Sequence, residues 1–294
     1  MSTAYVLPPC TPLPLHLRCF SRSDASLLIR GPWRYGAHEG CSELGLGCYF
    51  QPHDQCSHAL HMGAASDALH AVDTLKEQRV GTWHAPNWQE VEPRADGYVP
   101  KNMGLPHHHG VLWWRALLAM WLMQPKPALA LRLRRMKSEL SWSGHIIGVH
   151  VRHGDACFHA ATSSYRPPCA QWEEYAAAAL RIGQLYGGIN TIYLSTDDMT
   201  VVEQAQADAR FKVLHISFDR HVFENNWFIE YRMAEGAVDT RMVSESAVLD
   251  AMLLGECDFF VGRWRTVQLT RAAYPLTRLA FAALPATSLD WRWS

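Results

Sequence analysis

Residues 146–155 read IIGVHVRHGD, an apolar run that turns abruptly into charge and imidazole. The apolar part predicts a buried strand over 145–152. Charged groups are not buried in the middle of such a strand without partners, so they mark its end. The stretch therefore places Arg152, His153 and Asp155 at a strand terminus, where side chains are available for chemistry.

Beyond this strand, apolar strand patterns alternate with helical ones, with one long irregular segment before the third helix. Strands are predicted over 191–195, 211–216 and 257–261, and helices over 171–186, 201–210, 244–254 and 266–274. This alternation indicates right-handed βαβ units and a mainly parallel sheet. In such sheets ligands bind beyond the carboxyl ends of the strands.

Those carboxyl ends carry a concentration of polar residues. His150 and Arg152 end the first strand, residues 195–198 (STDD) end the second, and residues 262–266 (GRWRT) follow the fourth. Arginines together with backbone N–H groups at the start of a helix favour anionic oxygens, such as those of a diphosphate. Taken singly, each of these residues is more often a surface ion pair or a helix cap, but their convergence on one sheet edge favours a site.

Asp250 lies within the apolar helix sequence AVLDAMLLG. A buried carboxylate needs hydrogen-bond donors, and the N1–H and exocyclic amine of guanine are one such pair. An internal bridge within the protein is the alternative interpretation.

Composition excludes several classes of protein. The chain has 294 residues, a formal net charge of −1, 48% hydrophobic residues and 19% charged residues. This balance is typical of a compact folded enzyme and does not match a general nucleic-acid binder. No targeting signal is visible and no run reaches the roughly 18 apolar residues of a spanning helix. Either the protein is cytosolic or an N-terminal segment is missing from the sequence.

The eight cysteines include no C-x-x-C pair. Cys157 and Cys169 bracket a loop, and a disulfide between them would stabilise the fold by roughly 3 kcal/mol in an oxidising compartment. Free buried thiols are the alternative. Cys41, Cys48 and Cys56 form an early cluster whose pairing the sequence leaves open.

Three ordered motifs carry a family resemblance: IIGVHVRHGD, IYLSTDD and SESAVLDAMLLGECDFFVG. Together with GPWRYG and WWRALLAMWLMQPKPAL upstream, they resemble the α-1,6-fucosyltransferases, nodulation fucosyltransferases and protein O-fucosyltransferases. The resemblance implies an α/β fold of GT-B type, with two Rossmann-like lobes, a parallel sheet in the C-terminal donor-binding lobe, and an incomplete N-terminal lobe. It further implies inverting, metal-independent transfer of fucose from GDP-fucose, with no cofactor, to an acceptor glycan or glycoprotein.

Domain boundaries follow from this resemblance. We expect a poorly ordered N-terminus over 1–25, a partial acceptor-side lobe over 26–124, and the donor-nucleotide lobe over 125–294. Within the first lobe, a strand begins at Ala25 and helices are predicted over 60–75 and 113–123. A further helix over 128–140 opens the second lobe.

The resemblance also assigns roles to individual residues. Arg152 would hold the β-phosphate, His150 and Asp250 would recognise guanine, and Tyr35 would pack on the base. Asp197, Asp198 and Thr266 complete the implied donor site.

The catalytic base is open, because His153 and Ala156 stand where the α-1,6 group has Arg and Lys, and the acidic residue expected shortly afterwards is absent. His153, Asp155 and His159 are the candidates, and histidine has the better intrinsic pKa for accepting a proton near neutrality.

Two other classes remain as alternatives: a non-catalytic nucleotide- or glycan-binding protein of the same fold, and a metal-binding protein built on the histidines at 107–109. The family resemblance implies the Golgi or another secretory lumen, with membrane association only through an anchor that this sequence does not contain.

Overall fold

The computed structural model describes residues 3–7, 26–30, 34–41, 45–51, 123–154, 156–157, 169–224, 228–263 and 286–288. The chain divides into two compact units, one formed by Met1–Trp114 with Trp121–Gln124 and the other by Arg115–Met120 with Pro125–Ser294. Several predicted features lie outside the described residues: Asp155, His159, Thr266, the histidines at 107–109, and the helices expected over 60–75, 113–123 and 266–274.

The first unit contains a two-stranded antiparallel sheet. Strand β1 (Thr3–Leu7) pairs with β2 (Ser26–Arg30), so the strand expected from Ala25 is confirmed. Strand β1 differs from our expectation, which placed no regular element in residues 1–25. Two short 3-10 helices follow, η2 (Arg34–Gly36) and η3 (Gly45–Cys48).

Glycine is required where η2 meets η3. A Cβ built on Gly36 would lie 1.9 Å from the Gly45 carbonyl oxygen, so the two backbones touch directly. A disulfide between Cys41 and Cys48 closes the loop that connects the two helices. The sequence identified the cysteine cluster but not this pairing.

The second unit is built on a parallel sheet of five strands. The strands are β3 (Ile147–Val151), β4 (Thr191–Thr196), β5 (Lys212–Leu214), β6 (Phe259–Gly262) and β7 (Ala286–Ser288). Their order is β5-β4-β3-β6-β7, and every neighbouring pair is parallel. The predicted α/β class and parallel sheet of this lobe are therefore confirmed.

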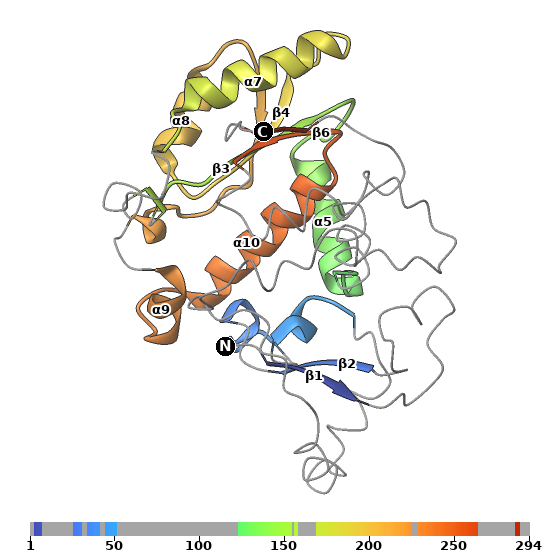
Figure 1. The fold of residues 1–294 in the computed structure, drawn as a ribbon, viewed down its shortest axis with the longest axis vertical. Helices are drawn as coiled ribbons and strands as arrows, with labels where there is room; N and C mark the ends of the chain where they lie inside the picture. Colours follow the sequence, from blue (N-terminus) through green and yellow to red (C-terminus); the bar gives the residue numbers. More distant parts are fainter. Residues whose placement is uncertain are drawn as a thin grey trace, which may run out of the picture. The chain divides into compact units, whose positions relative to one another are not determined.

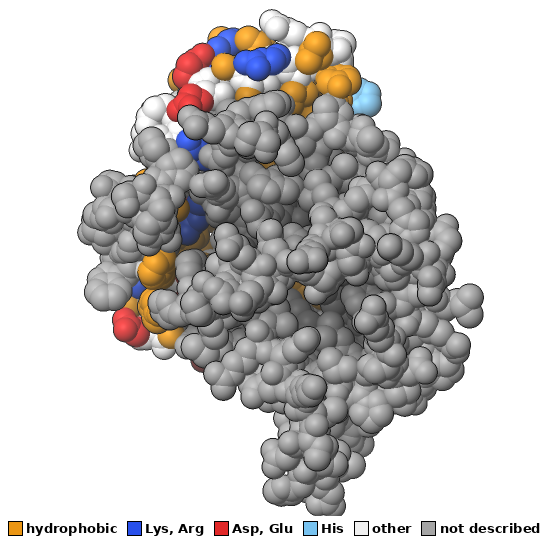
Figure 2. Space-filling view, in the orientation of Figure 1, with side chains coloured by type: hydrophobic (Ala, Val, Ile, Leu, Met, Phe, Trp, Pro, Cys, Tyr) orange, Lys and Arg blue, Asp and Glu red, His pale blue; other side chains and the backbone are white. Residues whose placement is uncertain are grey.

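Helices cover both faces of this sheet (Figure 1). Helices α7 (Trp172–Leu185) and α8 (Met199–Ala207) pack on one face, where Val149, Val151 and Leu194 lie in the hydrophobic core. Figure 2 shows acidic and basic side chains close together, among hydrophobic ones, on the part of the surface at the top of the view. Glu173 of α7 forms an ion pair with Arg210.

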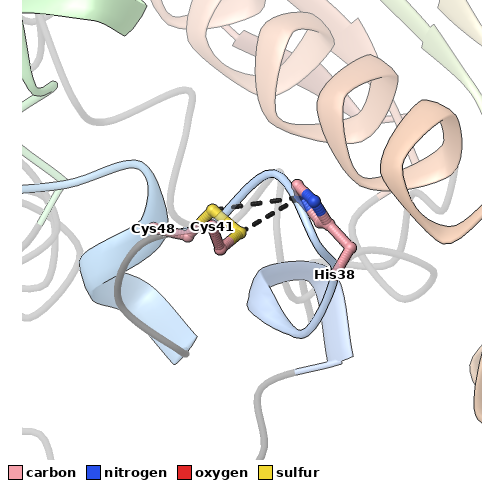
Figure 3. A group of neighbouring side chains, drawn as sticks. All are labelled: His38, Cys41 and Cys48. Atoms are coloured by element: carbon pink, nitrogen blue, oxygen red, sulfur yellow. Dashed lines mark hydrogen bonds between the residues drawn. A yellow bond between two sulfur atoms is a disulfide. The ribbon is translucent and has the colours of Figure 1, made fainter.

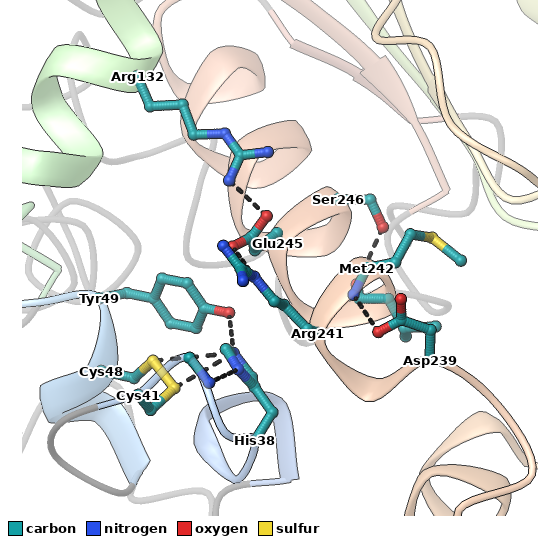
Figure 4. Close-up of polar contacts among 12 residues, drawn as sticks. His38, Cys41, Cys48, Tyr49, Arg132, Asp239, Arg241, Met242, Glu245 and Ser246 are labelled. Carbon is teal, nitrogen blue, oxygen red and sulfur yellow. Dashed lines mark hydrogen bonds and ion pairs between the residues drawn. A yellow bond between two sulfur atoms is a disulfide. The ribbon is translucent and has the colours of Figure 1, made fainter.

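Helices α5 (Pro127–Glu139) and α10 (Thr240–Gly255) form the other layer. Glu245 of α10 joins them by accepting hydrogen bonds from Arg132 of α5 and from Arg241 on its own helix (Figure 4). The Asp239 side chain caps α10 by accepting a hydrogen bond from the Met242 N–H, which starts the helix earlier than the predicted Ser244.

The long irregular segment contains two short elements that the sequence did not predict, η7 (His221–Phe223) and α9 (Ile229–Ala234). Among the described residues, no helix is both long enough and apolar enough to cross a membrane. The predicted Cys157–Cys169 disulfide is present and joins the segment after β3 to the start of α7.

Candidate functional site

The strand order predicts a ligand site beyond the carboxyl ends of β3 and β6. From β3 the chain builds β4 and β5 on one side of the sheet and then crosses to add β6 on the other side. Such a reversal leaves a crevice beyond the carboxyl ends of the two strands that flank it, and ligands of open α/β sheets bind there. His150 and Arg152 lie at this end of β3, and Arg263 follows β6.

Arg152 is held in place by an aspartate from the neighbouring strand. Its guanidinium donates to Asp197 Oδ2, and Asp197 Oδ1 accepts the backbone N–H of His153 at 2.8 Å. One carboxylate thus fixes both the side chain of Arg152 and the backbone that follows it. Asp197 acts through Arg152, because a carboxylate by itself would repel an anionic ligand.

Gly154 fits closely against this ion pair. Its φ is +31°, and a Cβ at this position would lie 2.6 Å from Asp197 Oδ2. A side chain here would have to displace the carboxylate that holds Arg152.

His153 is hydrogen-bonded through both ring nitrogens. Nδ1 lies 2.8 Å from Asp198 Oδ2 and Nε2 lies 2.9 Å from the carbonyl oxygen of Ala170. Both partners only accept hydrogen bonds, so both nitrogens must donate and the ring is an imidazolium. Burial, the largest single effect, lowers the pKa of His153, but the Asp198 and Ala170 bonds outweigh it and the pKa is raised above 6.5. In this arrangement the ring has no lone pair with which to accept a proton.

Asp198 is also the N-cap residue of α8. Its Oδ1 accepts the Thr200 N–H at 2.8 Å, and the hydrogen bond from His153 contributes most to lowering the pKa of its carboxyl. His153 therefore connects β3, the segment before α7, and the start of α8.

The stability contributed by His153 should depend on pH. A group whose pKa is raised by folding stabilises the fold below its unfolded pKa, and this contribution disappears as the pH rises through the folded value. We therefore expect the loss of unfolding free energy in His153→Gln to be larger at pH 5.5 than at pH 9, as measured by urea denaturation.

His221 is the matched control, because its imidazole pairs with Glu224 on the exposed surface. His221→Gln should change stability little at either pH. If the loss of unfolding free energy in His153→Gln grows as the pH rises, the imidazolium assignment is wrong.

His150 and Asp250 lie on the face of the sheet that α10 covers. Among the described residues, the buried Nδ1 of His150 has no hydrogen-bond partner, and burial, followed by the charge of Arg152, lowers the pKa of this ring to about 3. In β4, Ser195 is the register partner of His150, and both Ser195 and Tyr193 hydrogen-bond to Asp250. Burial raises the pKa of Asp250 to about 7. Asp250 thus bridges α10 to β4 through Tyr193 and Ser195.

Arg220 is a buried cation in the irregular segment after β5. No sequence pattern predicted a functional role for it. It is 2% exposed, and its guanidinium donates to the carbonyl oxygens of Thr196 at 3.0 Å and Ile216 at 2.9 Å. It also stacks over the ring of Phe218, 4.0 Å from the centroid. Burial lowers its pKa, and its charge acts on Asp250. Arg220 therefore adds positive charge at the carboxyl ends of β4 and β5.

A cleft of about 490 Å³ adjoins the Arg152–Asp197 pair. His153 and Asp198 form one wall, the Cys157–Cys169 disulfide forms another, and Gln204 and Phe223 contribute from α8 and η7. The predicted disulfide therefore shapes the site directly.

Of the predicted site residues, the second unit brings together His150, Arg152, His153, Asp197, Asp198 and Asp250. Tyr35 is half-buried in η2 of the first unit. Asp155 and Thr266 lie outside the described residues.

Comparison with known proteins identifies relatives of this chain. α-(1,6)-Fucosyltransferase of Drosophila melanogaster is 28% identical over 91% of this chain and 41% of that protein. The solved structure of NodZ α-1,6-fucosyltransferase soaked with GDP-fucose is 22% identical over 52% of this chain and 43% of that chain, with a TM-score of 0.32. NodZ from Bradyrhizobium is 20% identical over 57% and 46%, with a TM-score of 0.33. The chain thus spans less than half the length of each relative.

The family match extends well beyond the site motifs. Residues 32–289 match the family described as α-(1,6)-fucosyltransferase N- and catalytic domains. This range contains every strand of the parallel sheet, from β3 to β7. The chain belongs to the α-(1,6)-fucosyltransferase family.

Proposed function

We propose that this chain binds GDP-fucose at the carboxyl ends of β3 and β6 and transfers fucose to a hydroxyl of an acceptor glycan or glycoprotein. The observation that carries the proposal is the position of Arg152 and His150, which end β3 at the point where the strand order reverses. Family membership supports the reaction class, and the geometry supports the roles proposed for the residues.

Arg152 is the residue that stabilises the leaving diphosphate. Its guanidinium is oriented by Asp197, which is itself fixed by the backbone of His153. As the glycosidic bond breaks, negative charge grows on the β-phosphate, so a preorganised guanidinium binds the transition state more tightly than the ground state. Arg263 and Arg220 add positive charge at the same sheet edge.

His150 and Asp250 form the guanine site. An ionised carboxylate accepts hydrogen bonds at several positions, so Asp250 can receive the N1–H and amine of guanine while it keeps Tyr193 and Ser195. The buried and unpartnered Nδ1 of His150 gains a partner when the base is bound.

His153 in this proposal positions the site and is not the catalytic base, because both of its nitrogens donate to fixed acceptors. Asp155 and His159 are then the remaining candidates to accept the proton of the acceptor hydroxyl. Asp198 supports His153, and Thr266 supplies contacts to phosphate oxygens.

The remaining features of the proposal are those that the family resemblance implies. Transfer inverts the anomeric carbon and requires neither a metal ion nor a cofactor. Residues 26–124 form the acceptor-side lobe and residues 125–294 the donor lobe of a GT-B arrangement. The two disulfides suit a secretory compartment such as the Golgi lumen.

GDP should stabilise the protein more than UDP or ADP does. Only guanine offers two adjacent donors to Asp250, and a ligand at 100 times its Kd adds about 2.7 kcal/mol to the free energy of unfolding. Thermal melts with each nucleotide at equal concentration measure this difference.

Asp250→Asn is the matched variant, because an amide keeps the size of the side chain but presents a donor to the donors of guanine. We expect it to abolish the preference for GDP while Arg152→Ala weakens the binding of all three diphosphates. Equal shifts with GDP, UDP and ADP in the parent protein would rule out the guanine site. Fucose transfer from GDP-fucose to a panel of glycan acceptors then tests the activity itself.

A further inference from the structure

His38 lies against the Cys41–Cys48 disulfide (Figure 3). Its Nε2 is 3.2 Å from the sulfur of Cys41 and 3.9 Å from that of Cys48. The same nitrogen is 2.7 Å from the hydroxyl oxygen of Tyr49 (Figure 4). The roles proposed for the donor site make no use of this group.

The tautomer of His38 follows from its other nitrogen. The backbone N–H of Gly40 donates to Nδ1 at 3.1 Å, so Nδ1 carries the lone pair and Nε2 carries the hydrogen. A disulfide sulfur has no hydrogen to donate and only accepts. His38 therefore directs an N–H donor at the disulfide, closer to Cys41 than to Cys48.

This geometry favours one direction of disulfide cleavage. In thiol–disulfide exchange a thiolate attacks one sulfur and the other leaves as a thiolate, and the leaving group departs faster when its negative charge is stabilised. An N–H donor lowers the pKa of a neighbouring thiol for the same reason. Cys41, the nearer sulfur, is thus the better leaving group.

We propose that Cys41–Cys48 is a site of thiol–disulfide exchange, at which a small thiol such as glutathione attacks Cys48. The new bond joins the attacking sulfur to Cys48 Sγ while the Cys41–Cys48 bond breaks, and both electrons of that bond remain on Cys41 as a thiolate that accepts the His38 Nε2–H. A second thiolate attacking the mixed disulfide releases Cys48 and carries away an oxidised thiol pair. Both cysteines are partly exposed, so a thiol can reach them.

These three side chains do not offer a metal site in this state. The two sulfurs are bonded to each other, and Nε2 carries a hydrogen while Nδ1 accepts the Gly40 N–H. Zinc would need two thiolates and an unprotonated ring nitrogen.

Within the described residues, the Cys157–Cys169 disulfide is the internal comparison. Within the described part of the chain, no imidazole hydrogen-bonds to Cys157 or Cys169, because His153 directs its nitrogens to Asp198 and Ala170. We expect Cys157–Cys169 to exchange more slowly and to be insensitive to changes at His38.

The experiment exposes the folded protein to glutathione for short times, blocks free thiols with N-ethylmaleimide, and maps both labels by peptide mass spectrometry. The expected intermediate carries glutathione on Cys48 and maleimide on Cys41. His38→Phe should slow this exchange by about three- to tenfold and equalise the labelling of the two cysteines. Circular dichroism verifies that the variant is folded.

Tyr49→Phe provides a test in the opposite direction. Removing the hydroxyl takes away an oxygen 2.7 Å from His38 Nε2 that competes with the sulfur for its hydrogen, so exchange should be as fast as in the parent protein or faster. Equal labelling of Cys41 and Cys48 in the parent, or an unchanged rate in His38→Phe, would overturn the proposal. These experiments measure labelling of the two cysteines and not fucose transfer. Their outcome is therefore independent of the proposed enzyme activity.

Discussion

Arg152→Ala should abolish detectable fucose transfer and weaken GDP binding, while the protein remains folded. The guanidinium loses its contact with the leaving diphosphate, and Asp197 is left as an unpaired negative charge beside the phosphates. Arg152→Lys should lower kcat on the order of a hundredfold or more, because a single ammonium cannot reproduce a planar pair of donors. Single-turnover assays with saturating GDP-fucose measure the effect, and calorimetry measures GDP affinity.

Arg181 serves as the control for Arg152, because it is an exposed arginine on α7 of the same unit. Arg181→Ala removes the same charge from the chain and should leave both kcat and GDP affinity unchanged. If Arg152→Ala binds GDP and transfers fucose as the parent does, then the assignment of the phosphate site is wrong.

Arg220→Met should be among the most destabilising single substitutions in the second unit. Methionine retains much of the aliphatic stem but removes the Arg220 donors from the buried carbonyl oxygens of Thr196 and Ile216, the second of which also contacts His215 Nδ1 at 3.0 Å. Each unsatisfied buried group costs about 1–3 kcal/mol, so we expect a loss of about 2–5 kcal/mol in the free energy of unfolding. Urea denaturation measures this quantity directly.

Arg210 provides the comparison for Arg220. It forms ion pairs with Glu173 and Asp208 on the surface, where solvent replaces lost hydrogen bonds. Arg210→Met should therefore be nearly neutral. If the two variants prove equally stable, the buried hydrogen bonds of Arg220 do not contribute to the fold as proposed.

Strands β3 to β6 of the second unit were predictable because their signals are local. Apolar runs bounded by polar residues located β3 and β4, and their alternation with helical patterns predicted the parallel sheet. The ends of these strands then placed Arg152 and Asp197 at one edge. The Cys157–Cys169 pairing was predictable for the same reason, since the two cysteines bracket one loop.

The partners of the site residues were not predictable, because they depend on packing between distant segments. Nothing near Arg220 in the sequence indicates that β4 and the segment after β5 will surround it with carbonyl oxygens. In the same way, the second acceptor for His153 is a backbone carbonyl at Ala170, which carries no sequence signal. The sequence therefore indicates His153 as a candidate base, whereas the structure shows an acceptor beside each of its nitrogens.

The strand order also affects how the protein folds while it is synthesised on the ribosome. β3 is a central strand, yet β6, which completes its second side, is translated after β4, β5 and α10. At typical elongation rates, the nascent chain holds β3 with one unpaired, apolar edge for about ten seconds. Open edges of this kind can pair with other strands until β6 emerges.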